Sequence, residues 1–215
     1  MAAKIIDDTI LQDIAEAIQE KDGGSKMRIG DMAARILAIE TQNNMAVTNM
    51  IINRNISTIE SDVSSVGYSS FSRCINLTSA IFSEAQSLGM SSFEKCSRLT
   101  NIEIPKAAVI DEKCFYDCIR LHRIFLRSVV QISVQSFRAC SALTTVVMGT
   151  RAHMSDSDAF LNSNNAIIYV QPDDIGWYRE QTNWSAYSNR IKSLSELTGD
   201  DLTWYQQQLT KYPLS

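Results

Sequence analysis

The chain has 215 residues and a formal net charge of −4. This length is sufficient for one or two domains with a substantial hydrophobic core. The acidic balance argues against a general binder of nucleic acid or of anionic membranes. No apolar run reaches the roughly 18 residues that a membrane-spanning helix requires, so no membrane insertion is expected.

Residues 1–44 predict a helical segment for attachment or oligomerisation. Apolar side chains recur at helical spacing between residues 7 and 21, and a second short amphipathic pattern runs from Met32 to about Ile39. A glycine-containing turn at residues 22–25 separates the two patterns. A hairpin of this size is too small to be stable alone, so its apolar face must meet the rest of the chain, another copy or a partner protein.

The segments on either side of this hairpin carry weaker signals. Residues 1–8 lack the apolar stretch of a secretory signal, which predicts that the protein is made in, and stays in, the cytoplasm of the producing cell. Residues 45–60 are expected to form a linker and an N-terminal cap. Within them, Ile56–Ile59 resembles a degenerate first repeat.

Residues 61–172 repeat with a period of 22 residues. Each repeat carries the phrase Phe-x-x-Cys-x-x-Leu, and the four regular phrases begin at Phe71, Phe93, Phe115 and Phe137. A fixed period of this size predicts a solenoid, in which each repeat is one coil that buries its apolar face only against its neighbours. The last coil is irregular, with Phe160 one residue late, as expected of a terminal coil.

A strand with alternating polarity is predicted after each phrase. One parity is apolar in every coil and predicts the inward face of the strands. These residues are Ala80, Phe82, Ile102, Ile104, Ile124, Leu126, Val146, Met148, Ile168 and Val170. The predicted fold class is therefore α+β: a solenoid of 22-residue coils with an N-terminal helical hairpin and a C-terminal aromatic and helical cap.

The residue between the two inward positions of each strand is predicted to point to solvent. This outward column is mostly apolar and consists of Ile81, Glu103, Phe125, Val147 and Tyr169. One interpretation is the ordinary preference of sheet surfaces for such residues. The other is an exposed apolar stripe that a partner or a neighbouring subunit covers. With the polar edges that His122 and Arg123 add, the column forms the candidate binding face.

Four of the five cysteines recur once per coil, at Cys74, Cys96, Cys118 and Cys140. They are predicted to stack as buried, small apolar groups, and an odd total does not favour a disulfide framework. Zinc is the alternative, but it requires four ligands in a tetrahedron, which a linear ladder does not supply. Cys114 lies outside the ladder and is also predicted to be a packing residue.

Residues 173–215 are expected to form a C-terminal cap and tail. A short helix with Trp177 and Tyr178, followed by Trp184 and Tyr187, predicts a lid over the end of the solenoid in preference to a binding site. A last helix is expected at about 202–209. The side chains of this last segment are unusually apolar for a free tail, which favours docking on a neighbouring molecule; they are Trp204, Tyr205, Leu209 and Tyr212.

Residue types that carry chemistry are sparse. His122 and His153 fall in different coils, and no Ser-His-Asp or Cys-His arrangement can be drawn from the spacing. The glycine-rich nucleotide motifs and the His-Glu-x-x-His zinc motif are missing from the sequence. The sequence therefore predicts no enzymatic activity, no cofactor and no metal site.

The repeat unit Leu99-Thr-Asn-Ile-Glu-Ile-Pro, followed by Ile110 and then Phe115-x-x-Cys118, resembles the BspA-like leucine-rich repeat. The resemblance covers roughly residues 61–172. The glycine that usually precedes the phenylalanine turn is present early in the repeats but is replaced by Asp111 and Ser133 later. This departure predicts a different backbone geometry in the later turns.

Both ends of the chain resemble segments of phage proteins. The stretch from Ile168 through Trp177-Tyr and Trp184-Ser-Ala-Tyr is similar to the tail that follows such repeats in proteins of Gram-positive bacteria and their phages. The stretch from Ile14 to Ala34 is similar to a short N-terminal segment of phage tail and minor virion proteins. The resemblance implies a structural virion protein of the tail tip, baseplate or a fibre, synthesised and assembled in the host cytoplasm.

The partners that the resemblance implies are other virion proteins, bound through residues 1–44, and a host surface receptor that is a glycan or a protein. It also implies a homo-oligomer. One alternative is an intracellular bacterial protein-interaction module of prophage origin. A third possibility is a tail-associated carbohydrate-cleaving enzyme, which would need paired acidic residues, whereas Glu103 is the only acid in the outward column.

Overall fold

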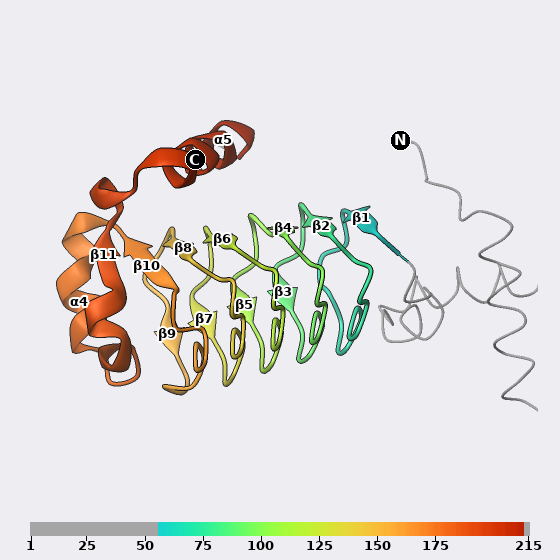
Figure 1. The fold of residues 1–215 in the computed structure, drawn as a ribbon, viewed down its shortest axis with the longest axis horizontal. Coiled ribbons are helices and arrows are strands. Elements are labelled where there is room, and N and C mark those ends of the chain that lie inside the picture. Colours follow the sequence, from blue (N-terminus) through green and yellow to red (C-terminus); the bar gives the residue numbers. More distant parts are fainter. Residues whose placement is uncertain (1–55, 213–215) are drawn as a thin grey trace, which may run out of the picture. The chain divides into compact units, whose positions relative to one another are not determined.

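A computed structural model of the protein describes residues 56–212. Figure 1 shows these residues as a row of coils, with helices at the C-terminal end of the row. The predicted helical hairpin of residues 1–44 lies outside the described residues, as does most of the predicted linker at 45–60.

Two sets of parallel strands run along the stack as two rows (Figure 1), and each coil contributes one strand to the longer set. This longer set, the main sheet, pairs in the orders β1-β2-β4 and β6-β8-β10-β11. Its strands are β1 (Thr58–Ser61), β2 (Ser79–Phe82), β4 (Asn101–Glu103), β6 (Arg123–Leu126), β8 (Thr145–Met148), β10 (Ile167–Val170) and β11 (Ile191–Ser193). The second sheet has the order β3 (Ser87–Leu88), β5 (Val109–Ile110), β7 (Gln131–Ile132) and β9 (His153–Met154).

The 22-residue period sets the strand register through most of the stack. Leu88 pairs with Ile110, which pairs with Ile132, so that identical positions of successive coils lie next to each other. All the strand residues predicted to face inward are buried, and this prediction is confirmed. Because each of these columns is apolar throughout, every coil buries its apolar side chains against those at the same positions of the next coil.

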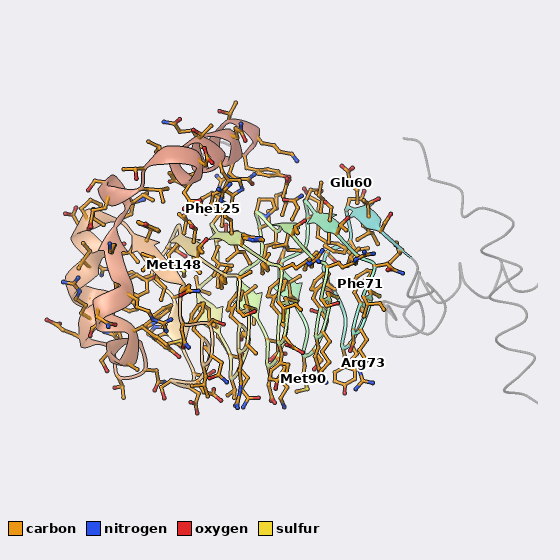
Figure 2. All side chains as sticks on the ribbon, viewed as in Figure 1. Glu60, Phe71, Arg73, Met90, Phe125 and Met148 are labelled. Atoms are coloured by element: carbon orange, nitrogen blue, oxygen red, sulfur yellow. The ribbon has the colours of Figure 1, made fainter. Side chains whose placement is uncertain are left out.

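The phenylalanine column forms a continuous stack in the interior. Ring centroids of neighbouring coils lie 5.3, 5.4, 5.3 and 5.0 Å apart from Phe71 to Phe160, and the rings are nearly parallel. Offset stacking at this separation is favourable for aromatic pairs. Figure 2 shows Phe71 at the N-terminal end of this column.

The cysteine column is buried, and all five cysteines are free thiols. Three thiols of the column donate to the carbonyl oxygen of the phenylalanine one coil earlier, as in the 2.9 Å hydrogen bond from Cys96 Sγ to Phe71 O. Cys118 and Cys140 repeat this bond at 3.1 and 3.0 Å. In the last coil Ser163 Oγ donates to Phe137 O at 2.6 Å. The irregular fifth phrase is therefore Phe160-x-x-Ser163, with a hydroxyl in place of the thiol.

The turns of successive coils share one backbone geometry. Ser69, Ser91, Lys113 and Gln135 have φ values of 52°, 55°, 53° and 56°. The prediction that the turns at Asp111 and Ser133 would differ from those at the earlier glycines is wrong, because the left-handed residue lies two positions after the glycine position. The glycine at position 89 instead allows two coils to approach closely, since a Cβ there would lie 3.0 Å from the backbone of Gly67.

The first strand begins earlier than the predicted solenoid boundary at residue 61. β1 starts at Thr58 and pairs in parallel with β2, Thr58 opposite Ser79. This register is one residue shorter than the regular period. The degenerate sequence around Ile59 therefore still supplies a complete edge strand, because backbone hydrogen bonding does not require the full repeat phrase.

The aromatic residues after the repeats cover the C-terminal end of the stack. They lie in α4 (Ile175–Glu180) and the 3-10 helix η2 (Trp184–Arg190), which η1 (Pro172–Asp174) precedes. Trp184 and Tyr187 pack against Phe160 at ring distances of 6.1 and 5.7 Å. The sequence reading missed β11, which follows η2 and pairs in parallel with β10 to extend the main sheet by one strand.

The last helix, α5, spans Gly199–Lys211 and follows the short 3-10 helix η3 (Leu194–Glu196). Its apolar side chains were expected to dock on a neighbouring molecule. They pack instead on the outward side of the main sheet of the same chain, where Tyr205 contacts the cluster of Phe125, Val147 and Leu197. In Figure 1, α5 lies above β6 and β8.

Candidate binding face

The outward side of the main sheet, here called the ladder face, presents two rows of side chains. The predicted column Ile81, Glu103, Phe125, Val147 and Tyr169 is one row, which Glu60 extends at β1. The second row was missed by sequence reasoning and comprises Thr58, Ser79, Asn101, Arg123, Thr145 and Ile167. The signal for it was present, because strand residues two positions apart share a face.

The expectation that the predicted column points to solvent is wrong for its centre. Phe125 is 8% exposed and Val147 is fully buried. The ring of Phe125 meets that of Tyr205 edge-on, with centroids 5.3 Å apart and planes at 82°. Figure 2 places Phe125 on the side of the sheet that α5 covers. The apolar stripe is thus occupied by the chain's own C-terminal helix.

Arg123 fixes the N-terminal end of α5 to the ladder face. Its Nε lies 2.5 Å from Asp201 Oδ1. Thr145 Oγ1 donates a hydrogen bond of 2.6 Å to the other carboxylate oxygen of Asp201. Arg123 and Thr145 both belong to the second row of the ladder face. From the sequence, Arg123 was predicted as a polar edge of the face, but this row was not identified.

Glu103 fixes the C-terminal end of the same helix. Its carboxylate accepts hydrogen bonds from the Lys211 ammonium and from the Tyr212 hydroxyl, the latter at 2.7 Å. Burial alone would favour the protonated acid, but the hydrogen bonds from Lys211 and Tyr212 outweigh it and lower the pKa of Glu103. Burial and the same contact raise the pKa of the Tyr212 hydroxyl to about 12.

The remaining predicted face residues have separate environments. Ile81 is half-buried, and the His122 side chain is exposed. Tyr169 packs at the margin of the cluster under α5, and burial, with the nearby carboxylates of Asp201 and Glu196, raises its pKa. The structure therefore brings Phe125, Val147 and Tyr169 together, whereas it leaves Ile81 and His122 apart from them.

The N-terminal part of the ladder face carries small polar groups. Thr58 and Glu60 are exposed, and Ser79, Ile81 and Asn101 are half-buried. Asn101 Nδ2 donates a 3.0 Å hydrogen bond to Ser79 Oγ of the preceding coil. Figure 2 shows Glu60 projecting at the edge of the sheet. The face is therefore mostly polar over β1, β2 and β4, whereas its apolar cluster lies over β6, β8 and β10.

The thiols inside the coils are poor nucleophiles. Burial raises the pKa of Cys140 to about 12, and it raises the pKa values of Cys96, Cys114 and Cys118 as well. The thiolate is the reactive form, so these groups remain unreactive thiols at neutral pH. Within residues 56–212, no group of three or more His, Cys, Asp or Glu side chains could hold a metal ion. In the same range, no helix is long and apolar enough to cross a membrane.

The family model of the BspA-type leucine-rich repeat region matches residues 43–167 in six copies, which is more than half of the chain. This chain belongs to the BspA-type leucine-rich repeat family. The parallel sheets with few helices are the leucine-rich-repeat fold of this family, and the stacked Phe, Cys and Leu columns are its repeat positions.

Solved leucine-rich repeat proteins share this fold. The T. pallidum leucine-rich repeat protein is 23% identical over 59% of this chain and 62% of that chain, with a TM-score of 0.52. A leucine-rich repeat protein from Bacteroides ovatus is 21% identical over 64% of this chain and 35% of that one, with a TM-score of 0.51. A leucine-rich cell surface protein from Faecalibacterium prausnitzii is 22% identical over 61% and 34%, with a TM-score of 0.48.

The BspA-type chain covers less than two thirds of the length of each of these solved proteins. At these identities the likeness concerns the fold of the repeats alone. No curated protein sequence matches the chain.

Proposed function

We propose that this BspA-type repeat protein is a non-catalytic binding protein that presents the ladder face to a partner. The observation that carries the proposal is the division of this face into an open, mostly polar part over β1 and β2 and a part with an apolar cluster that α5 covers. Regular strands, about 4.8 Å apart, give the open part evenly spaced hydroxyl, amide and carboxylate groups. An extended, evenly spaced surface suits recognition of another macromolecule better than it suits enclosure of a reacting small molecule.

The chemistry of the described residues supports a binding role. Both histidines are exposed and far apart in the fold, since His122 directly precedes β6 of the main sheet and His153 lies in β9 of the second sheet. The buried thiols are held protonated, and the Glu103 carboxylate is engaged by Lys211 and Tyr212. These groups stabilise the coils and α5, which is a structural use of side chains that could otherwise carry catalysis.

More specifically, we propose a structural role in a phage particle, at the tail tip, baseplate or a fibre. The support is the resemblance of residues 14–34 to a segment of phage tail and minor virion proteins, and of residues 168–194 to the tail that follows such repeats in proteins of Gram-positive bacteria and their phages. In this role residues 1–44 would attach the protein to other virion proteins, and the repeats would present the ladder face to a host receptor or to a neighbouring virion protein.

The test is detection of the protein in purified particles of a phage that encodes it. Density-gradient particles are analysed by quantitative mass spectrometry, with an abundant host cytosolic protein as the contamination control. The expected result is a fixed copy number per particle, well above that control. Absence from particles, with the protein free in the cytoplasm, would contradict the virion role and favour an intracellular interaction module.

Single variants test whether the ladder face does the binding. Ile81→Asp places a charge on its open part and should weaken retention of the co-purifying partner by about tenfold or more, because loss of one central contact often has that effect. Val130→Asp is the matched control, because Val130 is 47% exposed and adjoins β7 of the second sheet. Equal retention by the two variants would show that another surface binds.

A further inference from the structure

The ladder face carries features complementary to α5 along the whole length of the helix. Arg123 on the face meets Asp201 in the first turn of the helix, and Glu103 on the face meets Lys211 in its last turn. The charges on the helix also match its dipole, since acids favour helix N-termini and bases favour C-termini. The two ion pairs therefore fix both the position and the direction of a helix on this face.

The apolar contact between the two charged ends is small and specific. Tyr205 is the one residue of α5 that is buried, and it packs edge-on against Phe125. Leu202, Trp204 and Leu209 lie partly buried around this contact. Under α5 the face thus presents an apolar cluster between polar side chains that bind the two ends of the helix.

The connection to α5 has the character of a hinge. Leu197 is 3% exposed and belongs to the cluster with Phe125 and Val147, so the chain is anchored up to that point. The next three residues, at 198–200, are exposed. Gly199 has a φ of +60°, and a Cβ at this position would meet nothing within 4 Å. A glycine in the left-handed region changes direction at low cost.

The end cap and α5 are held by different means. In the cap, Tyr178 and Trp184 are buried and donate hydrogen bonds of 2.7 Å to backbone carbonyls inside the last coil, and β11 adds a strand to the sheet. α5 instead lies outside the sheet and meets it through side chains and the carbonyl of Tyr212, which accepts a bond from Arg127. The helix can leave the face without opening the core of the coils.

We propose that the ladder face is a helix-receiving site and that α5 of a second copy of this chain can occupy it, so that two copies exchange their C-terminal helices. Exchange recreates every contact described above, with Asp201 of one copy on Arg123 of the other. Reciprocal exchange of an identical element about an exposed hinge is a low-cost route to a dimer. The proposal goes beyond the binding function proposed above, because it concerns the part of the face that α5 covers and leaves the open part free for another partner.

The free-energy balance predicts when exchange occurs. The intramolecular and intermolecular contacts are the same, so the difference lies in the effective concentration of the chain's own helix. The closed monomer is favoured at low concentration, and the exchanged dimer gains population as the protein concentration rises.

Complementary charge variants of the full chain test this proposal. Arg123→Asp places an acid on the face opposite Asp201, and Asp201→Arg places a base on the helix opposite Arg123. Each variant repels its own helix, but the helix of each fits the face of the other. Light scattering of an equimolar mixture should show a heterodimer that forms at least about tenfold more tightly than either variant associates with itself.

Two controls separate helix exchange from simple attraction and from misfolding. The double variant Arg123→Asp/Asp201→Arg restores the pair within one chain and should behave as the wild-type protein. Tyr205→Ala added to both mixed variants should weaken the heterodimer by about tenfold, because it removes the central aromatic contact. The proposal would be overturned if the double variant folds but the mixture of single variants forms no heterodimer. It would also be overturned if Tyr205→Ala leaves the affinity of the heterodimer unchanged.

The outcome is independent of the particle assay. A protein found in phage particles that exchanges no helix would retain the proposed function and lose this inference. A chain that exchanges helices but is absent from particles would retain the inference and lose the virion role.

Discussion

At the residue scale, the interior of the coils depends on identical side chains that stack on one another. Phe115 is fully buried, and its ring lies between those of Phe93 and Phe137 at 5.4 and 5.3 Å. No smaller side chain can maintain both contacts, because the coil spacing is fixed by the backbone hydrogen bonds of the neighbouring coils. A truncation at this position therefore leaves a cavity that the structure cannot close.

Phe115→Ala should lower the free energy of unfolding by about 3–5 kcal/mol, the usual cost of removing a buried aromatic ring. Denaturant unfolding followed by circular dichroism measures the change. Ile119→Ala in the same coil is the matched control, since Ile119 is 43% exposed, and it should change stability by less than about 0.5 kcal/mol. Equal effects of the two substitutions would contradict the stacked-core description.

Glu103 makes part of the stability depend on pH. Its pKa is lowered in the folded protein because the contacts from Lys211 and Tyr212 outweigh its burial. An acid with a lowered folded pKa stabilises the folded state fully above its unfolded pKa, about 4.3 for Glu, and this contribution is lost as the pH falls through the folded pKa.

Glu103→Gln should therefore lower the free energy of unfolding at pH 7 by roughly 0.5–1 kcal/mol, a modest value because the Lys211 side chain is 48% exposed. The difference between the wild-type protein and this variant should shrink as the pH falls from 7 to about 3. Glu60→Gln, on the exposed edge strand, serves as the control and should show no such trend. A difference that stays constant with pH would refute the role of the Glu103 charge.

At the element scale, the C-terminal segment divides into two parts with different tasks. α4, η2 and β11 close the last coil, where they bury Tyr178, Trp184 and Tyr187 and extend the sheet edge. An open apolar end is a liability of any stacked fold, and this cap covers it, while β11 takes the place of β10 as the edge strand. α5 instead covers the outward side of the main sheet at Phe125 and Val147.

The position of α5 changes what a substitution at Phe125 reports. A charge at this position would first release α5, because Phe125 packs against Tyr205. Loss of partner binding by such a variant could therefore result from the changed face or from the released helix, and the measurement would not separate the two causes. Positions on the open part of the face, such as Ile81, are therefore the cleaner probes of partner binding.

At the scale of the whole molecule, each coil contacts mainly the coils before and after it. Stability in such an array is approximately a sum of coil and interface contributions. The coil of residues 83–104 begins after one inward strand residue, Phe82, and ends at the next, Ile104. A second copy of residues 83–104 inserted after Ile104 would keep every column in register, and it would leave the sheet positions from Arg123 onward under α5.

This 22-residue insertion should give a folded protein with unchanged or higher stability and a parallel-sheet circular dichroism spectrum. Insertion of 11 residues, half of the period, is the control and should unfold the repeats, because it places polar residues in the inward columns. Unfolding caused by the full-period insertion would show that the coils are not equivalent units.

The sequence by itself determined the coils. A strict period shows which residues of successive coils stack on one another. The buried Phe, Cys, Leu and strand positions could therefore be predicted from the sequence, and the likeness to the BspA-type repeat followed from the same residues. The irregular phrase at Phe160 could also be located, although the replacement of the thiol by Ser163 needed the hydrogen bond to Phe137.

Only the tertiary structure decided what covers the outward face. The apolar character of Phe125 and Val147 and that of the last helix were both visible in the sequence, and each alone suggested a contact with another molecule. The contact between the face and the helix joins residues far apart in the sequence. Thr145 and Asp201 are 56 positions apart, and Glu103 and Lys211 are 108 positions apart. A repeat period carries no information about such a contact, because α5 stands outside the repeat and its place is set by complementary charge and shape rather than by register.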